Sequence, residues 1–312
     1  MRKIIRTIFK FIALLIGVFI CLYPIQRTLH PNYFSDVTNI VDGFYDLEPD
    51  TVDVLFAGAS QMFCTVDAET LTRDYGISSY DFGGSAQVLP VSAYYINEAL
   101  KTQHPKVIAV EICMLFIKNQ DIEDNAFTWF YDPMPLTLDK VISAFEILPP
   151  HKAIQYTFLP IIRTHSRWAT VQSWDISHNW GQWDYACPTR GFLPHQEATS
   201  VDILYKSEYE GEIKEIPCEV KNSLLNLASM CRERGVRLLF FKAPVANWSR
   251  GESVAAKAFM EENGLEYLEM NDYLDEMGID SKTDFFNDAH LNASGAAKAT
   301  IFLAEYIKPM LE

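Results

Sequence analysis

The stretch Val54-Leu55-Phe56-Ala57-Gly58-Ala59-Ser60-Gln61-Met62 decides the fold that this sequence predicts. Apolar residues with strand character run into Ala-Gly-Ala, and a serine follows where a helix can begin. Small residues let the backbone turn tightly and let a substrate carbonyl approach it. Many α/β hydrolytic enzymes expose a nucleophilic serine at such a strand-to-helix turn. The same residues are also compatible with an ordinary βα turn that has a serine near a helix N-cap, so the choice between the two depends on the rest of the chain.

The stretch opens a regular alternation of strands and helices. We expect strands over 52–56, 79–82, 107–112, 236–241 and 267–270, and helices over 68–75, 90–103, 219–234, 252–263 and 293–311. The third strand is apolar and β-branched, which is typical of a strand buried on both faces. Alternation at this spacing indicates βαβ units. The predicted fold is therefore a three-layer α/β/α sandwich with a mostly parallel sheet, in which 288–291 forms a loop before the last helix.

Residues 116–217 interrupt that alternation, and we interpret them as an insertion that caps the sheet. We expect helices there over 138–147 and 152–164. The segment is rich in aromatic residues: Trp129, Tyr131, Trp168, Trp174, Trp180, Trp183 and Tyr185. Most of these rings suit a small hydrophobic core of the insertion, and some would suit stacking on a sugar.

Length and charge limit the classes of function. The 312 residues, 49% of them hydrophobic, are enough for one large α/β domain with an insertion. A formal net charge of -15 argues against a nucleic-acid surface and against electrostatic docking on anionic lipid. The cysteines and histidines have no metal-site spacing, so we expect neither a metal nor a cofactor. Cys187 and Cys218 could pair outside the cytoplasm, which the sequence leaves open.

The N-terminus predicts a membrane anchor. Residues 1–10 carry Arg2, Lys3, Arg6 and Lys10 without an acidic residue, and residues 11–25 are uncharged and almost wholly apolar. With its flanks the run approaches the ~20 residues that span a bilayer. No small-x-small cleavage site precedes Pro24, which favours an uncleaved signal anchor over a signal peptide or a buried soluble helix. The basic end should stay in the cytoplasm and the rest outside.

These features divide the chain into three predicted parts. We expect a transmembrane helix or signal anchor over 1–30 and a polar-aromatic linker over 31–50. An α/β domain over 51–312 should follow, with its insertion at about 116–217.

Three residues from opposite ends of the chain can form a catalytic constellation. Ser60 supplies a hydroxyl that becomes a good nucleophile only when an imidazole, here His290, takes its proton. Asp288 could orient that imidazole through its other nitrogen. Backbone N–H groups of Ser60 and Gly84 would form an oxyanion hole, to which Gln87 or Asn292 could add a side-chain amide.

The ordered set of motifs resembles the SGNH/GDSL hydrolase superfamily. It consists of Gly58-Ala59-Ser60, then Phe82-Gly83-Gly84-Ser85-Ala86-Gln87, and finally Asp288-Ala289-His290-Leu291-Asn292-Ala293-Ser294-Gly295-Ala296. His165-Ser166-Arg167-Trp168 and Phe241-Lys242-Ala243-Pro244 are similar to a narrower subgroup, the membrane-anchored envelope proteins related to the D-alanyl transfer protein of teichoic acid synthesis. The resemblance covers most of the chain after residue 50 and implies an SGNH-type, flavodoxin-like sandwich.

By this resemblance Ser60 is the nucleophile, Gly84 the oxyanion glycine and His290 the base. Two positions depart from the superfamily pattern. Its aspartate usually lies three residues before the histidine, where this chain has Asn287, so Asp288, Asp284 or a Ser-His dyad remain the alternatives. Its oxyanion asparagine after the third strand is replaced by Glu111-Ile112-Cys113.

The resulting expectation is serine-dependent acyl-ester chemistry outside the membrane, either hydrolysis or O-acyl transfer. The resemblance implies a cell-envelope polysaccharide or teichoic acid as substrate and a membrane-bound O-acyltransferase as partner. His165 and Arg167 are either substrate contacts or structural parts of the insertion, and Lys242 is expected to be a solvated strand-end charge. The alternative is a non-catalytic SGNH-like module that binds a glycan or an acyltransferase partner.

Overall fold

The computed structural model describes residues 2–30, 37–121, 126–181, 187–207, 211 and 213–312. Trp183 and Tyr185, two of the aromatic residues of the predicted insertion, therefore lie outside the described residues. The chain forms two compact units. We call Met1–Ser35 with Pro135–Asp184 the helical unit, and Asp36–Met134 with Tyr185–Glu312 the sheet unit.

The sheet unit is built on five parallel strands in the order β2-β1-β3-β4-β5. The strands are β1 (Val54–Gly58), β2 (Ser79–Gly83), β3 (Val107–Glu111), β4 (Arg237–Lys242) and β5 (Tyr267–Glu269). Every residue of β1, β2 and β3 is buried, as their continuous apolar runs require in a sheet covered on both faces. The predicted α/β fold with a parallel sheet is confirmed.

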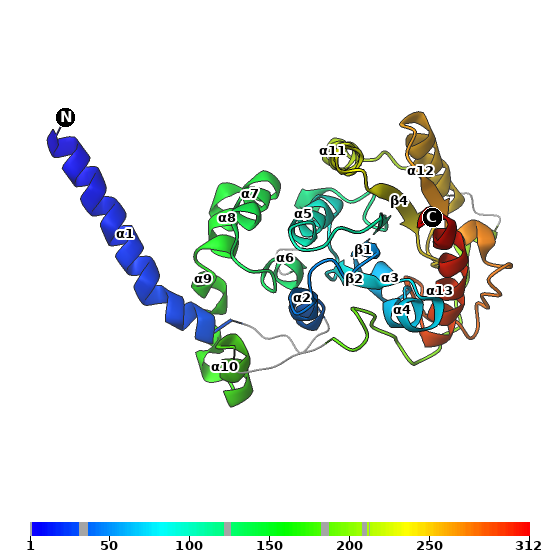
Figure 1. Cartoon of the computed structure of the whole chain (residues 1–312), viewed down its shortest axis with the longest axis horizontal. Coiled ribbons are helices and arrows are strands. Elements are labelled where there is room, and N and C mark those ends of the chain that lie inside the picture. The colour runs from blue at the N-terminus through cyan, green and yellow to red at the C-terminus, as the bar shows by residue number, and fades with distance from the viewer. Residues whose placement is uncertain (1, 31–36, 122–125, 182–186, 208–210, 212) are drawn as a thin grey trace. The chain divides into compact units, whose positions relative to one another are not determined.

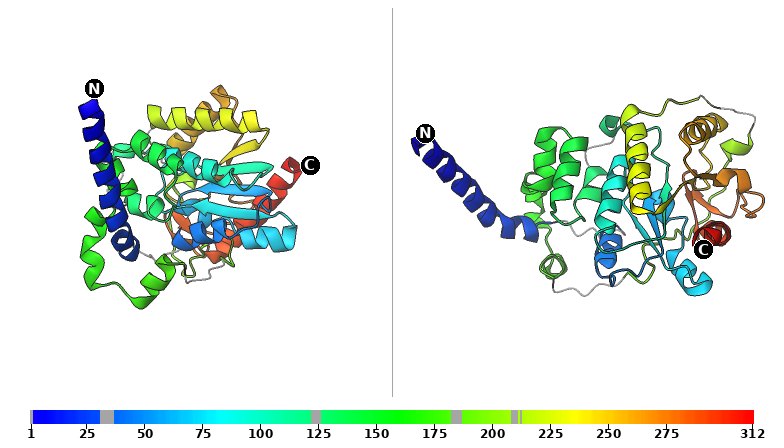
Figure 2. Two further views of the ribbon diagram at one scale, coloured as in Figure 1. Left: turned by 60° about the vertical axis from the view of Figure 1, so that its left-hand side comes forward. Right: turned by 45° about the horizontal axis from the view of Figure 1, so that its top comes forward.

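Helices cover both faces of this sheet (Figure 1 and Figure 2). They are α2 (Val37–Tyr45), α3 (Ser60–Phe63), α4 (Ala68–Tyr75), α5 (Leu89–Ala99), α6 (Ala126–Tyr131), α11 (Cys218–Arg234), α12 (Arg250–Glu262) and α13 (Ala293–Ile307). Alternate residues of β2 point to opposite faces. Phe82 contacts rings of α2 and α5, whereas the Ser79 hydroxyl binds Ala68 at the start of α4.

Helix α2 lies within the range that the sequence predicts as a linker. Its Phe44 is buried and stacks on Phe82 with ring centroids 4.0 Å apart. The Tyr80 hydroxyl donates to the carbonyl of Ile40 in the same helix. The linker prediction for 31–50 is therefore wrong for α2, because burial of its apolar face against β2 makes it part of the sheet unit.

A short antiparallel hairpin precedes α13, where the sequence predicts a loop. Its strands are β6 (Phe285–Asn287) and β7 (His290–Leu291). The second half of the predicted insertion also returns to the sheet unit. Backbone bonds run from Leu193 to Phe63, from Thr199 to Phe285 and from Ala293 to His195. Cys187 and Cys218 have free thiols.

The helical unit combines the N-terminal helix with the first half of the predicted insertion. It contains α1 (Arg2–Thr28), α7 (Leu138–Ile147), α8 (Pro150–Thr157), α9 (Ile161–Thr164), α10 (Ser173–Asn179) and a 3₁₀ turn over His165–Ala169. The helix expected over 152–164 is divided into α8 and α9, because Pro160 cannot continue the helical hydrogen bonds.

Helix α1 is long and apolar enough to cross a membrane. It has 27 residues, and an 18-residue window has a mean hydropathy of 2.4 with none of its residues buried. A spanning helix needs about 20 mostly apolar residues at a rise of about 1.5 Å each. A secretory signal sequence meets the same criteria of length and composition.

Candidate active site

Ser60 lies at the carboxyl end of β1, as the first residue of α3. The turn that delivers it depends on two glycines that face each other in the register of β1 and β2, Gly58 and Gly83. Gly58 has φ +152°, and a Cβ on Gly83 would lie 2.1 Å from the Gly58 carbonyl oxygen. Only glycines permit this approach, so the backbone itself fixes the position of the serine.

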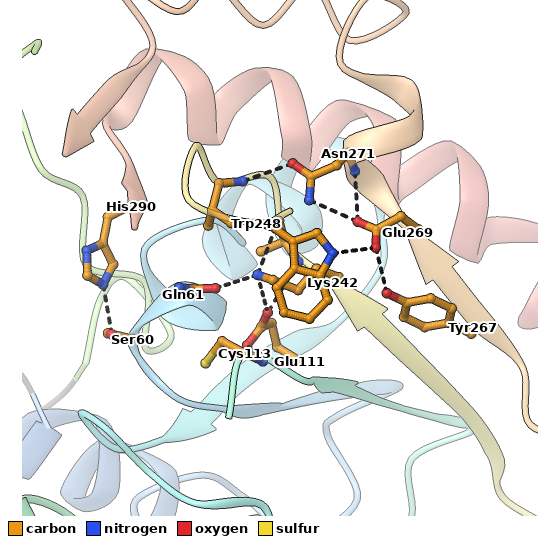
Figure 3. A network of polar contacts seen from close by, with 12 residues as sticks. Ser60, Gln61, Glu111, Cys113, Lys242, Trp248, Tyr267, Glu269, Asn271 and His290 are labelled. Carbon is orange, nitrogen blue, oxygen red and sulfur yellow. Dashed lines mark hydrogen bonds and ion pairs between the residues drawn. The ribbon is translucent and has the colours of Figure 1, made fainter. Parts of the chain in front are cut away.

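His290 is the hydrogen-bond partner of Ser60. Its Nε2 lies 2.8 Å from the Ser60 Oγ (Figure 3). The histidine comes from β7, so the fold joins a residue of the first βα turn to one 230 positions later in the chain. The two residues that the sequence pairs as nucleophile and base are thus in direct contact.

Asn287, and not Asp288, contacts the other nitrogen of the imidazole. The Asn287 Oδ1 lies 3.0 Å from the His290 Nδ1. Asn287 and His290 are cross-strand partners in the β6–β7 hairpin, so their side chains lie on the same side. Asp288 falls in the turn between them; it is exposed, and its carbonyl accepts from Ala246 and Asn247. The prediction that Asp288 orients the base is corrected for this reason.

The orientation of the Asn287 amide fixes the tautomer of His290. The Ala289 backbone N–H donates to the Asn287 Oδ1 at 2.9 Å, and only the oxygen of the amide can accept that bond. The same oxygen faces the His290 Nδ1, which must therefore carry the proton. The Nε2 is left with its lone pair toward Ser60, which is the arrangement of a general base before proton transfer.

The surroundings of His290 keep its imidazole neutral. Its pKa is lowered from 6.5 to about 4, mainly by burial and then by the charges of His195 and Lys242, while Glu111 acts in the opposite direction. An aspartate beside Nδ1 would raise the pKa, but the Asn287 amide carries no charge. The imidazole is thus free to accept a proton at neutral pH, with little local stabilisation of the imidazolium that results.

His195 is a residue of this site that no motif in the sequence predicts. Its ring stacks on Phe286 with centroids 3.9 Å apart and lies 5.8 Å from the His290 ring. It reaches the site on the segment that returns from the predicted insertion, and its carbonyl accepts from the Ala293 N–H at 2.7 Å. Because His195 and His290 are 95 positions apart in the sequence, only the fold could reveal their proximity.

The expected oxyanion residues have different surroundings. Gly84 follows β2 directly, next to the strand that ends before Ser60, and a Cβ there would lie 2.8 Å from the Cβ of Phe130. Ser60 begins α3, so its N–H lies outside the helix's own hydrogen bonds. Gln87 is buried, and its Nε2 donates to the Ser92 Oγ at 2.9 Å, so its side chain does not support the expected role as an oxyanion donor.

A buried ion pair contacts Gln61, the residue after Ser60, where the sequence predicts a solvated Lys242. The Lys242 Nζ is 3.1 Å from the Glu111 Oε1 and also donates to the Gln61 side chain (Figure 3). Both charged side chains are almost fully buried, at 1% and 0% exposed. The solvated-charge prediction is wrong because β3 and β4 are neighbours in the sheet and their last residues are paired through its interior.

Glu111 occupies the position where the resemblance implies an oxyanion asparagine. Its carboxylate accepts from the backbone N–H groups of Cys113 at 2.8 Å and Ala243 at 3.3 Å, besides the ammonium of Lys242. A carboxylate of this kind cannot donate to an oxyanion. Its contacts instead hold the ends of β3 and β4 and, through Lys242 and Gln61, the first turn of α3.

A second buried carboxylate, Glu269, supports this ion pair from the β5 side. It accepts from the Trp248 Nε1, the Tyr267 hydroxyl and the Asn271 Nδ2, each at 2.9 Å (Figure 3). The Trp248 ring thereby lies with its centroid 5.1 Å from the Lys242 Nζ. The cation faces an aromatic ring on one side and a carboxylate on another, which compensates for its removal from water.

The remaining predicted residues bind structural partners. The Asn292 side chain caps α13 by accepting from Ser294 and Gly295, and donates to the Thr283 carbonyl at 2.8 Å. Asp284, the alternative acid, is buried and bound to Lys298. Both side chains therefore connect the segment around the hairpin to α13. These contacts do not support the expected role of Asp284 at the imidazole or that of Asn292 as an oxyanion donor.

His165 and Arg167 belong to the helical unit and bind groups of that unit. The exposed His165 contacts the Ile162 carbonyl through Nδ1 at 3.0 Å. Arg167 donates to the Leu29 carbonyl at 3.0 Å and pairs with Asp175 at 2.9 Å. Of the two interpretations that the sequence leaves open, these contacts favour the structural one for Arg167. Across the described residues, no group of three or more His, Cys, Asp or Glu side chains could hold a metal ion.

No protein-family model matches this chain, and no curated protein matches it. Among solved structures it is similar to a protein of Bacteroides fragilis NCTC 9343 described as a "putative acylhydrolase". The two chains are 9% identical with a TM-score of 0.40, over 90% of this chain and 100% of the other. A likeness at this level says nothing about activity, for which the contacts around Ser60 are the evidence.

Proposed function

We propose that this protein is a serine-dependent acyl-ester hydrolase or O-acyltransferase. The observation that carries the proposal is the contact of the Ser60 Oγ with the His290 Nε2 at 2.8 Å, with the imidazole held in one tautomer by Asn287. A neutral imidazole at this distance is within reach of the proton that the serine must lose. Within the part of the chain that the structure describes, the imidazole is bonded to Ser60 and Asn287 and to no aspartate, so Ser60, His290 and Asn287 form the proposed catalytic set.

In the first half of the proposed reaction, the Ser60 Oγ attacks an ester carbonyl while its proton passes to the His290 Nε2. The carbonyl oxygen becomes an oxyanion, for which the backbone N–H groups of Ser60 and Gly84 are the proposed donors. Collapse of this intermediate breaks the ester C–O bond. The leaving alcohol takes the proton from His290, and an acyl-enzyme remains on Ser60.

In the second half, a water molecule or an acceptor hydroxyl attacks the acyl-enzyme. His290 removes the proton of the attacking group and returns it to Ser60 when the acyl C–O bond to the serine breaks. Water as the acceptor gives hydrolysis, and a sugar or polyol hydroxyl gives transfer. The same residues serve both outcomes, so access of the acceptor to the site decides between them.

The proposed substrate is an ester of a cell-envelope polysaccharide or of a teichoic-acid-type polymer. The support is the resemblance to membrane-anchored envelope members of the SGNH/GDSL superfamily, together with an N-terminal helix long and apolar enough to span a bilayer. Its basic first residues would stay in the cytoplasm and leave the sheet unit outside. A membrane-bound O-acyltransferase that supplies acyl groups is the proposed partner.

A fluorophosphonate probe tests the proposed nucleophile. The full chain in detergent should be labelled, Ser60→Ala should lose the label, and His290→Ala should be labelled at least about 100-fold more slowly. Ser85→Ala is the matched control, because Ser85 lies in the loop after Gly84 and should leave labelling unchanged. Equal labelling of the parent and Ser60→Ala would refute the proposal.

A second candidate function is a non-catalytic module that binds an envelope glycan or an acyltransferase. The observation in its favour is the neutral Asn287 in contact with His290, because an amide stabilises an imidazolium less than a carboxylate does. A folded parent that resists the fluorophosphonate and is retained on an immobilised envelope polysaccharide would support this module over the enzyme.

A further inference from the structure

The end of helix α1 is held by the other helices of its own unit. Gln26 is the buried residue of α1. Its side chain donates to the Phe158 carbonyl at 3.2 Å and accepts from the Ile161 N–H at 3.4 Å. A polar side chain buried with both ends bonded is a specific attachment, since removal of either partner would leave a buried polar group unsatisfied.

The residues after Gln26 continue this attachment. Arg27 donates to the Asn179 carbonyl, and its guanidinium lies 4.7 Å from the Trp180 ring centroid. The Trp180 Nε1 donates to the Thr28 hydroxyl at 3.3 Å. Arg167 then donates to the Leu29 carbonyl at 3.0 Å. We call residues 158–180, which make these contacts, the collar.

The collar begins where the apolar surface of α1 ends. The apolar 18-residue window of α1 has no buried residue, whereas Gln26 and Leu29 are buried by the collar. A spanning helix leaves the hydrocarbon layer where its apolar run stops, which in this sequence is Ile25. The collar therefore contacts the part of α1 that would lie at the boundary between lipid and water.

Large apolar side chains are exposed on the collar itself. Their exposed fractions are 49% for Ile162, 76% for Trp168, 43% for Ile176 and 40% for Trp180. Three of them lie next to a contact with the end of α1 or with Leu29 after it, or make one: Ile162 follows Ile161, Trp168 follows Arg167, and Trp180 binds Thr28. Tryptophans with adjacent aliphatic residues are the side chains that membrane proteins place at the headgroup level.

We propose that the collar is a lipid-binding surface, with Ile162, Trp168, Ile176 and Trp180 inserted in the interfacial layer of the leaflet from which α1 emerges. Helix α1 is then a retained anchor, because its last turn is part of the folded helical unit and would not be discarded with a signal sequence. The collar is then a second contact of the helical unit with the bilayer, in addition to α1.

The proposed contact is apolar and not electrostatic. The charged side chains of the collar are Arg163, Arg167 and Asp175, and the last two are paired with each other, so the collar carries little net charge to attract anionic headgroups. The energy must then come from burial of indole and aliphatic surface, at roughly 25 cal/mol per Å². Uncharged phosphatidylcholine should therefore be sufficient, and added anionic lipid should not strengthen the contact.

Fluorescence quenching by brominated lipid tests the collar. The full chain is reconstituted into phosphatidylcholine vesicles with or without bromine on the acyl chains, and quenching of tryptophan emission is measured. Trp168→Phe should remove a clear part of the quenchable emission, since Trp168 is 76% exposed and its loss should leave the fold intact. Trp248→Phe is the control, because Trp248 is buried in the sheet unit and should contribute only unquenched emission.

The outcomes separate lipid from other occupants. Equal quenching in the parent and Trp168→Phe, or quenching that needs anionic lipid, would overturn the proposal; a protein partner would then be the occupant to seek. Release of the chain from the vesicles by alkaline carbonate would overturn the retained anchor. Ser60→Ala should be quenched like the parent, so this test is independent of the proposed chemistry.

Discussion

The side-chain oxygen of Asn287 accepts the Nδ1–H of His290 at 3.0 Å, so the base of the candidate site is oriented by a neutral amide. A hairpin places the two residues opposite each other, and the Ala289 N–H fixes the amide with its oxygen toward the ring. The pair therefore supplies the tautomer that proton transfer requires but not the negative charge that stabilises the product of that transfer.

Replacing Asn287 with aspartate should raise the pKa of His290. In the parent this pKa is about 4, so the base form prevails above pH 4. A carboxylate at 3.0 Å favours the imidazolium, and the acidic limb of the labelling rate should move upward by at least about one pH unit. Asp288→Asn, a change in the adjacent turn, should leave the limb in place. An unshifted limb in Asn287→Asp would contradict this electrostatic account.

Replacing Asn287 with leucine should slow the labelling of Ser60. The variant keeps the approximate size of the side chain but removes the acceptor of the Nδ1–H, so the imidazole is no longer held with its lone pair toward the serine. We expect a loss of about 100-fold in the labelling rate with a fluorophosphonate. Asp288→Ala changes a neighbour that does not contact the ring and should label at the parent rate. A similar loss in both variants would point to disruption of the hairpin instead.

The fold could be predicted because its determinants are local. The apolar runs of β1 and β3 and the small residues before Ser60 can be recognised in the sequence. Strands buried on both faces occur in few fold classes, chiefly α/β folds with a parallel sheet. Helix α2 was hidden because its residues are apolar at helical spacing yet flanked by polar and aromatic ones. Its place was decided by the contact of Phe44 with Phe82, which is a tertiary event.

A site residue could be predicted only where its place next to a strand or turn and the chemistry of its side chain indicated the same role. Ser60 and His290 are such residues: Ser60 begins the helix after β1, and His290 begins β7 in the hairpin before α13. Asp288 was wrong because spacing alone does not show which residues of a hairpin turn face the ring. The burial of Lys242 depends on Glu111 in the neighbouring strand, and the place of His195 depends on a long returning segment. Pairings of this kind exist only after folding.

Removing the buried cation should destabilise the sheet unit strongly. Lys242→Met leaves the Glu111 carboxylate buried without its ammonium partner, at a cost of about 3–5 kcal/mol in the free energy of unfolding. The double variant Lys242→Met with Glu111→Gln should recover part of that loss, because the amide carries no charge. The recovery is incomplete, because Cys113 and Ala243 donate to different carboxylate oxygens and the amide offers only one. Urea unfolding of the detergent-solubilised chain measures both. A double variant as unstable as Lys242→Met would show that packing, and not charge, is what Lys242 contributes.

His290 should also make the stability depend on pH. Its pKa is about 4 in the folded protein and near 6.5 when unfolded, so between these values the unfolded chain binds a proton that the folded chain does not. The contribution of His290 to the free energy of unfolding should then fall as the pH is lowered from 6.5 toward 5. The contribution is about 1–2 kcal/mol, since each pH unit in this range is worth at most about 1.4 kcal/mol and the ring is partly exposed.

His290→Gln removes this titration, so its free energy of unfolding should rise less steeply with pH than that of the parent over that range, measured by urea unfolding at about pH 5.0, 5.5, 6.0 and 6.5. Burial raises the pKa of Asp81, which contributes the opposite slope in both proteins and cancels in the comparison. The window lies above the region in which Asp284 and Glu252 are protonated, so their lowered pKa values do not confound the comparison. His151→Gln, on an exposed position of α8, is the matched control and should keep the slope of the parent. Parallel profiles for the parent and His290→Gln would mean that His290 accepts its proton as readily in the folded chain as in the unfolded one. The burial that is proposed to keep it a free base would then be ineffective.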